Sequence, residues 1–381
     1  MDAADVCVIT QPVSDASASH IEDLLAVLGQ ITTVSLLAVN VPRDSPIRDD
    51  HEVVDIADTG TGRSIPTAAV RFLRNQLRLA RAVRQRDEDV VLFFGAIAYL
   101  LPVFAAKLSG KTVVLEPRGD VPLTLRLQWE ERVPDRVAGV LAGAVRALEQ
   151  TSYRLADAII TYTPSMADEL GLGRFERKLH PDGARFVDTE LFAPDTPHDE
   201  RDQVVGFLGR LDEEKGIREL AACAESLPSE MTFVFAGDGD LYGWLRRELS
   251  AERTAGSVEL TGWVDHTDVP VVLNRFKLLV LPSEPTEGLP TVVLESLACG
   301  TPVLTTPVSG LPDVVRDGET GFLTDAVEAE RLTATITAIL SRDDLGEIST
   351  AGRSLVESEY SFAAAVCRYD RILEDIAATE A

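Results

Sequence analysis

Short apolar runs alternate with longer stretches of helical periodicity through the first half of the chain. The runs are continuous and of strand length, a pattern typical of parallel strands that are buried on both faces. They predict strands over residues 6–10, 32–39, 90–94, 112–115 and 158–161. The stretches between them predict helices over residues 17–28, 66–86, 97–108, 134–155 and 164–170.

A second series of the same kind follows residues 193–203, a polar, proline-bearing segment that is the best linker candidate. Its strands are predicted over residues 204–208, 232–236, 258–261, 278–281 and 303–305, and its helices over 217–226, 241–251, 268–275, 290–298 and 362–376. Two doubly wound, Rossmann-like α/β domains are therefore expected, facing each other across a cleft at the carboxyl ends of their strands. We assign residues 1–195 to the first domain, 196–360 to the second, and 361–381 to a helix that packs back toward the first.

Composition limits the class of protein. The chain has 381 residues, 45% of them hydrophobic, which is ample for two globular cores. It has no run of 18 uncharged apolar residues and no secretory signal at its start, so we expect a cytoplasmic protein. Its four cysteines, Cys7, Cys223, Cys299 and Cys367, are scattered. This scatter favours structural thiols, and we expect no metal site.

The net charge of −26 argues against nucleic acid as a partner. The chain has 5 lysines against 31 arginines, and this lysine poverty with an excess of Asp and Glu is similar to proteins of salt-accumulating microbes. At molar salt the screening length falls to about 3 Å, so the mutual repulsion of the carboxylates largely vanishes. We therefore expect a halophilic protein whose stability rises between low and molar KCl.

One zone of the chain is basic. Residues 61–154 carry 15 Lys and Arg against 9 Asp and Glu, a net charge of +6. Within this zone Arg71, Arg74, Arg78 and Arg81 recur at helical spacing and form one cationic stripe. The stripe is either a solvated helix face or a peripheral contact with anionic lipid head groups or a polyprenyl phosphate acceptor on the inner face of the cell membrane.

Two cations follow the first strand of the second domain. The strand ends at Gly209, Arg210 and Lys215 lie in the loop, and a helix begins after Gly216. Arginine offers a planar fork, lysine a movable point charge and a helix N-terminus free N–H groups, which together suit a diphosphate. The alternative is a solvated loop whose cations offset nearby acids.

The next strand ends in a second glycine turn. Gly237 and Asp238 open a Gly-Asp-Gly segment that precedes a helix and forms half of a nucleotide-binding fingerprint. Glycines also occur in strand-to-helix turns for backbone reasons alone. The turn by itself does not establish a nucleotide site.

Two glutamates frame a third strand-to-helix junction, in the segment PSEPTEGLPTVVLESLACGTPV. Glu287 lies in the loop ahead of the predicted helix, and Glu295 lies inside its apolar run. Gly288 and Leu289 supply backbone N–H groups between them. A carboxylate that accepts two vicinal hydroxyls suits a ribose or another sugar ring. The alternatives are helix-dipole complementarity for Glu287 and an exposed helical carboxylate for Glu295.

Taken in order, GRLDEEKG, FAGDGDL, TGWV, the glutamate segment and SGLPDVVRDGETGFL resemble the retaining family-4 glycosyltransferases of the GT-B fold. The resemblance covers nearly all of residues 204–325. It implies that Glu287 lies against the donor sugar and that Glu295 binds the ribose of the nucleotide. By the same resemblance, the catalytic residues are Glu287, Arg210 and Lys215, of which Arg210 and Lys215 grip the diphosphate. The remaining donor-binding residues are expected to be Gly209, Gly237, Asp238, Gly288 and Leu289.

The first half resembles the family more loosely, through ADAIITYTPSMADEL and HPDGARFVDTELFAP. It has no Gly-Gly loop after the first strand, and LEPRGDVP stands where many members carry a histidine that faces the reacting sugar. Some members that act on lipid-linked acceptors have a similar acid–arginine–aspartate stretch. The resemblance therefore implies acceptor-side roles for Glu116, Arg118 and Asp120.

The expected activity is transfer of a sugar from a nucleotide sugar to a glycan, lipid-linked or polyprenyl acceptor in cell-surface glycan biosynthesis. The resemblance implies retention of the anomeric configuration, no metal and no cofactor. Two alternatives stay open: a sugar-nucleotide epimerase on the same fold, and a non-catalytic sugar-nucleotide sensor or scaffold subunit. The combination of Arg210, Lys215, Glu287 and Glu295 favours an enzyme.

Overall fold

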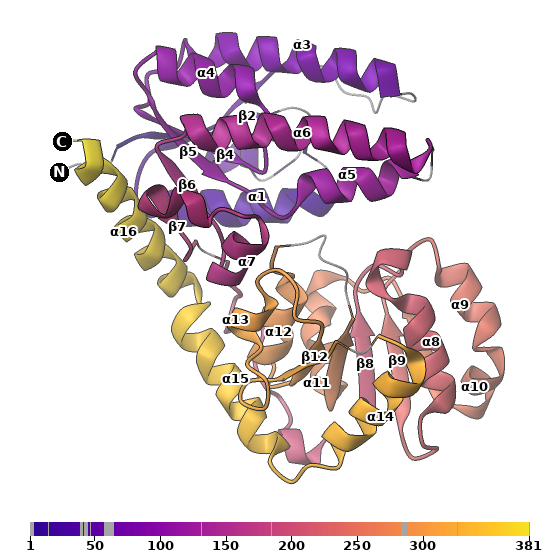
Figure 1. Ribbon diagram of the computed structural model, residues 1–381. Coiled ribbons are helices and arrows are strands. Elements are labelled where there is room, and N and C mark those ends of the chain that lie inside the picture. The colour runs from indigo at the N-terminus through magenta and orange to yellow at the C-terminus, as the bar shows by residue number, and fades with distance from the viewer. Residues whose placement is uncertain are drawn as a thin grey trace. The chain divides into compact units, whose positions relative to one another are not determined.

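The chain folds into two compact α/β units (Figure 1). The computed structural model describes residues 4–13, 15–38, 41, 45, 47–56, 65–130, 132–183, 185–282, 288–325 and 327–380. Unit 1 comprises Met1–Ala184 and Ala365–Ala381, and unit 2 comprises Arg185–Ala364. Each unit is built around one parallel sheet.

Unit 1 contains a seven-stranded sheet among its described residues, in the order β3-β2-β1-β4-β5-β6-β7. The strand order reverses between β1 and β4, and β4 pairs with β5. The loops after these three strands therefore leave the same edge of the sheet beside the switch point. The strands are β1 (Val6–Thr10), β2 (Val34–Ala38), β3 (Glu52–Asp55), β4 (Val90–Phe94), β5 (Thr112–Glu116), β6 (Ala158–Ile160) and β7 (Leu179–His180).

Four helices of unit 1 lie side by side: α3 contacts α4, α4 contacts α6, and α6 contacts α5 (Figure 1). Apolar residues of the strands and helices form the core, in which Phe93 and Ile9 are fully buried. The helices are α1 (Asp15–Leu28), α2 (Ile47–Asp50), α3 (Ile65–Val83), α4 (Leu100–Leu108), α5 (Val121–Glu130), α6 (Asp135–Leu155), α7 (Pro164–Glu169), the 3-10 helix η1 (Gly173–Lys178) and α16 (Phe362–Glu380).

Unit 2 contains a six-stranded sheet among its described residues, in the order β10-β9-β8-β11-β12-β13. Its strand order reverses between β8 and β11, which makes this pair the switch point. The strands are β8 (Val204–Leu208), β9 (Thr232–Ala236), β10 (Val258–Gly262), β11 (Leu278–Leu281), β12 (Val303–Thr305) and β13 (Phe322–Leu323).

The helices of unit 2 follow its strands in alternation. They are α8 (Ile217–Ser226), α9 (Tyr242–Glu248), α10 (Ser250–Ala255), α11 (Val269–Arg275), α12 (Thr291–Ala298), α13 (Leu311–Val314), α14 (Ala329–Leu340) and α15 (Leu345–Glu359), with the 3-10 helices η2 (His198–Glu200), η3 (Glu213–Lys215) and η4 (His266–Asp268). Helix α12 starts after Pro290, which suits the start of a helix, and Gly300 follows its end at φ +68°.

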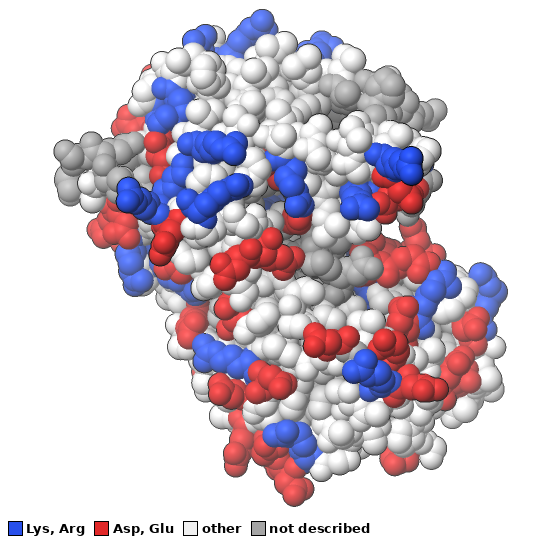
Figure 2. All heavy atoms as spheres, viewed as in Figure 1, with Lys and Arg blue, Asp and Glu red and all other residues white. Residues whose placement is uncertain are grey.

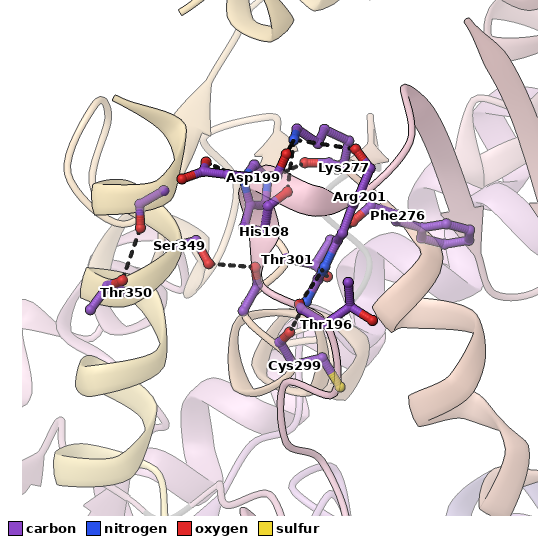
Figure 3. Close-up of polar contacts among 12 residues, drawn as sticks. Thr196, His198, Asp199, Arg201, Phe276, Lys277, Cys299, Thr301, Ser349 and Thr350 are labelled. Atoms are coloured by element: carbon purple, nitrogen blue, oxygen red, sulfur yellow. Dashed lines mark hydrogen bonds and ion pairs between the residues drawn. The ribbon is translucent and has the colours of Figure 1, made fainter. Parts of the chain in front are cut away.

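The linker segment, residues 193–203, belongs to unit 2, and Arg201 ties it to the body of that unit (Figure 3). Arg201 is 6% exposed. Its guanidinium donates hydrogen bonds of 2.6–3.2 Å to the carbonyls of Thr196, Phe276 and Cys299, the hydroxyl of Thr301 and the amide oxygen of Asn274. The boundary between the units therefore lies before residue 195, the boundary that we assigned from the sequence.

A second buried cation reinforces the same segment (Figure 3). The Lys277 ammonium donates to the carbonyls of His198 at 2.7 Å and Asp199 at 3.2 Å. Nε2 of His198 lies 2.9 Å from the Lys277 carbonyl in return. Both cations bind backbone oxygens, so they fix the path of the linker segment.

Candidate functional site

The predicted donor site lies at the switch point of the unit 2 sheet. Strands β8 and β11 are neighbours, and Lys215 lies beyond the end of the first while α12 follows the second. Gly216 has φ +67°, and a Cβ there would lie 3.0 Å from the Pro282 carbonyl oxygen. The loop after β8 therefore packs directly against the end of β11, and this close approach requires glycine.

The two predicted diphosphate ligands differ in burial. Lys215 is 6% exposed and ends the 3-10 turn η3. The Arg210 side chain is exposed, and its guanidinium donates to Asp212 and, at 2.8 Å, to Glu214 Oε1. Arg210 thus offsets acids of its own loop, and a diphosphate would have to compete with them for this guanidinium.

The glycine turns after β8 and β9 touch each other through their backbones. Gly209 has φ +152° and Gly237 φ +133°, and a Cβ on Gly237 would lie 2.0 Å from the Gly209 carbonyl oxygen. The Asp238 carbonyl accepts a hydrogen bond from the Leu211 amide at 3.0 Å. This contact requires Gly237 on structural grounds alone, and the donor-binding roles of these residues stay predictions.

Glu295 is buried in α12 and is only 8% exposed. The alternative of an exposed helical carboxylate is therefore wrong. Its Oε1 lies 3.6 Å from Nε2 of His266, in η4 beyond β10. Near the start of α12, Leu289 is 1% exposed and the Gly288 carbonyl accepts the Gly310 amide at 2.8 Å.

Glu287 lies outside the described residues, so its predicted contact with the donor sugar stays a prediction. Among the described residues, no group of three or more His, Cys, Asp and Glu side chains could hold a metal ion.

The three predicted acceptor-side residues of unit 1 make separate contacts. Glu116 is fully buried at the end of β5 and accepts a hydrogen bond of 2.5 Å from the Tyr369 hydroxyl of α16. Asp120 accepts one of 2.6 Å from Arg146, and its other oxygen caps the N-terminus of α5. The Arg118 guanidinium lies over the Phe94 ring, 5.1 Å from its centroid.

Of these three residues, Arg118 lines a cavity of about 150 Å³ at the switch point of the unit 1 sheet. The lining residues are Thr10, Gln11, Pro12, Ile21, Phe94, Gly95, Arg118 and Val121. Reasoning from the sequence missed Thr10 and Gln11. The signal for them is topological, because β1, β4 and β5 end together at one edge of the sheet.

Glu149 is a buried acid that the sequence did not single out, and it lies close to Asp120 and Arg146. Burial, helped by the negative charge of Asp120, raises the pKa of Glu149 in α6 to about 8, although Arg146 opposes the shift. Glu149 is therefore mostly protonated at neutral pH. Because a neutral carboxyl can donate a hydrogen bond, Glu149 can play a role that a carboxylate cannot.

Two parallel-sheet α/β units, each with polar groups at its switch point, define a fold that known structures share. A protein from Anabaena, HepE, solved in complex with UDP, matches with a TM-score of 0.71 at 16% identity, over 98% of this chain and 99% of that one. The chain therefore has the GT-B fold, as its sequence predicts.

The sequence of the second unit matches a family model. The matching residues are 188–351, and the model is described as glycosyl transferases group 1.

Curated relatives extend the likeness. A glycogen synthase of Mycobacterium tuberculosis is 30% identical over 233 residues, 58% of this chain and 55% of the relative. An alpha-D-kanosaminyltransferase of Streptomyces kanamyceticus is 26% identical over 77% of this chain and 78% of its own length. The chain thus spans about half the length of the glycogen synthase that it matches.

Proposed function

We propose that the protein transfers a sugar from a nucleotide-sugar donor to an acceptor hydroxyl. The observation that carries the proposal is a pair of buried charged residues, Lys215 and Glu295, beyond the two central strands of unit 2. A cation and an acid at a switch point suit the diphosphate and ribose of a nucleotide sugar. The UDP complex of HepE and the two curated relatives support this choice of substrate.

The proposed reaction retains the anomeric configuration and needs no metal. The bond from the sugar C1 to the diphosphate oxygen breaks, and its electron pair stays on that oxygen. The acceptor hydroxyl oxygen bonds to C1 on the same face and passes its proton to the departing phosphate. Lys215 and Arg210 stabilise the negative charge that develops on the diphosphate. Glu295 accepts hydrogen bonds from the ribose hydroxyls.

A donor screen tests the proposal. We expect one of UDP-, GDP- or ADP-glucose to raise the melting temperature. Saturation at 100 times the dissociation constant adds about 2.7 kcal/mol, which corresponds to a shift of about 5–10 °C for units of this size. The same donor should release its nucleotide slowly in water and faster with an acceptor. No shift and no release would contradict the proposal, and an epimerised donor without nucleotide release would identify the epimerase.

We further propose that unit 1 contacts an anionic membrane through α3. In this helix two polar residues are buried and three apolar residues are exposed. Asn75 and Gln76 are 5% and 4% exposed, whereas Val70, Leu73 and Leu77 are 69%, 54% and 45% exposed. The buried Gln76 side chain accepts a hydrogen bond of 2.9 Å from the amide of Leu101, the second residue of α4.

The same helix carries the cationic stripe of Arg71, Arg74, Arg78 and Arg81, and Figure 2 shows basic side chains over this side of unit 1. Exposed Phe104 and Leu108 of α4 extend the apolar surface, because α4 packs on α3. No helix among the described residues is long and apolar enough to cross a membrane. Apolar side chains that insert between anionic head groups, with arginines beside them, are typical of a peripheral contact.

Co-sedimentation with liposomes tests this contact. The protein should sediment with phosphatidylglycerol vesicles and not with phosphatidylcholine vesicles. The quadruple Arg71/Arg74/Arg78/Arg81→Gln variant should lose most of this binding, since each arginine near the surface contributes about 1 kcal/mol. A Leu73→Ser/Leu77→Ser variant should also bind more weakly. Arg331→Gln, an exposed arginine of α14, is the control. Equal sedimentation of all variants would contradict the contact.

A further inference from the structure

The cavity at the switch point of unit 1 combines features of a binding site. It is formed by the ends of β1, β4 and β5 and by the first turn of α5, and its volume is about 150 Å³. A water molecule takes up about 30 Å³ in the liquid, so this space holds about five waters. Whole small-molecule sites occupy about 300–1,000 Å³. The cavity is therefore sized for one substituent of a larger ligand.

A buried hydroxyl in the cavity wall indicates that something polar belongs there. Thr10 is 2% exposed, and its Oγ1 has no hydrogen-bond partner among the described residues. Buried hydroxyls are almost always hydrogen-bonded, because leaving one unsatisfied costs free energy. Thr10 lines the cavity, so a rotation of its side chain would bring this donor to a polar group bound there.

Arg118 is the charged residue among the described residues that line the cavity. The backbone at Gly95 leaves room for its side chain. Gly95 has φ +67°, and a Cβ there would lie 3.1 Å from Cδ of Arg118. The Gly95 carbonyl is held by the Gln11 side-chain amide at 2.5 Å. The Arg118 guanidinium stacks over Phe94, which forms another part of the wall. An arginine held in this way presents fixed donors that match a planar or tetrahedral anion.

The surrounding charges agree with an anionic guest. Four of the eight lining residues, Phe94, Gly95, Arg118 and Val121, lie in the basic zone, although the chain as a whole carries −26. Helix α5 begins at Val121, so the positive end of its dipole adds to the charge of Arg118. The Asp120 carboxylate at the same helix end is paired with Arg146.

We propose that this cavity binds a negatively charged substituent of the acceptor, either the carboxylate of an acidic sugar or the phosphate of a phosphorylated one. The identification of the ligand as the acceptor rests on the proposed function. The presence of an anion site does not. Arg118 binds the anion through charge-assisted hydrogen bonds, and the Thr10 hydroxyl donates one more. Unit 1 thereby selects acidic acceptors over neutral ones.

Calorimetric titration of the donor-free protein with glucuronate, glucose 6-phosphate and glucose tests the proposal. We expect at least one anionic probe to bind about 10–100-fold more tightly than glucose, as one charge-assisted hydrogen bond would provide. Glucuronate alone would identify a carboxylate site, and glucose 6-phosphate alone a phosphate site.

Variants connect this preference to the cavity. Arg118→Gln should remove the preference for the anionic probe over glucose, whereas Arg331→Gln should leave it unchanged. Thr10→Val keeps the shape of the side chain and should weaken anion binding about 2–10-fold, while Thr10→Ser should restore it. The Thr10 pair keeps the test valid if Arg118→Gln is poorly folded.

Two results would overturn the proposal: anionic probes that bind no better than glucose, or a preference that is unchanged in both Arg118→Gln and Thr10→Val. The anion titration does not use the donor. A protein that turns over a nucleotide sugar but shows no anion preference would refute only the cavity proposal. A protein with the preference but no donor turnover would refute the proposed function.

Discussion

A Lys215→Ala variant should transfer sugar about 100- to 1,000-fold more slowly than the wild-type protein. Lys215 is 6% exposed beyond the end of β8, where the departing diphosphate of the proposed reaction would develop its charge. Removing one such preorganised donor typically lowers kcat by this factor, because it acts more strongly on the transition state than on the ground state. The measurement is the steady-state rate with the donor that the thermal screen identifies.

The design separates catalysis from folding. Lys215→Met retains the apolar stem and should be as slow as Lys215→Ala, with a melting temperature close to that of the wild type. Arg218→Ala removes a cation from the next helix, where its guanidinium pairs with Glu213 at 2.6 Å, and should leave the rate unchanged. A folded Lys215→Met variant with more than a third of the wild-type rate would refute the proposed role.

Much of the fold was predictable because buried parallel strands are continuous apolar runs. β8, β9 and β11 have the predicted bounds. β3 was missed because it is an edge strand of four residues, EVVD, with an acid at each end. The helix predicted over residues 241–251 is two helices, because the backbone of the buried Leu249 leaves the helical conformation at ψ 31°.

The candidate site shows where sequence reasoning stops. The burial of Glu295 was predictable, since its neighbours along α12 are apolar. The pairing of Arg210 with Asp212 and Glu214 was open, because a loop with both charges can hold its cation or offer it to a ligand. The separate contacts of Glu116, Arg118 and Asp120 were not predictable, since they depend on Tyr369, Phe94 and Arg146, which other elements supply.

The linker segment gives the clearest example of a hidden structural residue. Its polar, proline-bearing composition reads as a flexible connection, yet Arg201 within it is buried. The oxygens that bind Arg201 include the backbone carbonyls of Phe276 and Cys299. Every residue type has a backbone carbonyl, so the sequence does not show which residues make this contact. Burial of a cation on backbone oxygens can therefore be recognised only once the fold is known.

We expect Arg201→Met to destabilise unit 2 by about 3–5 kcal/mol, because several buried oxygens would each lose a donor at a cost of about 1–3 kcal/mol. Methionine is similar in length, so the loss comes from the buried oxygens of Asn274, Phe276, Thr301 and Cys299, which would lose a donor. For a unit of this size the melting temperature should fall by about 6–20 °C. Calorimetry of the full-length protein measures this fall.

Arg331→Met provides the matched control, because Arg331 is an exposed arginine whose pairing with Glu328 is 3.5 Å long. Exposed pairs contribute at most about 1 kcal/mol, so its melting temperature should change by no more than about 4 °C. The melting temperature of Arg201→Lys should lie between those of the two methionine variants. An ammonium keeps the charge but lacks the planar fork with which the guanidinium reaches five oxygens. If Arg201→Met had the same melting temperature as the control, the guanidinium would be dispensable. The linker segment would then be held by its other contacts, such as those of Lys277.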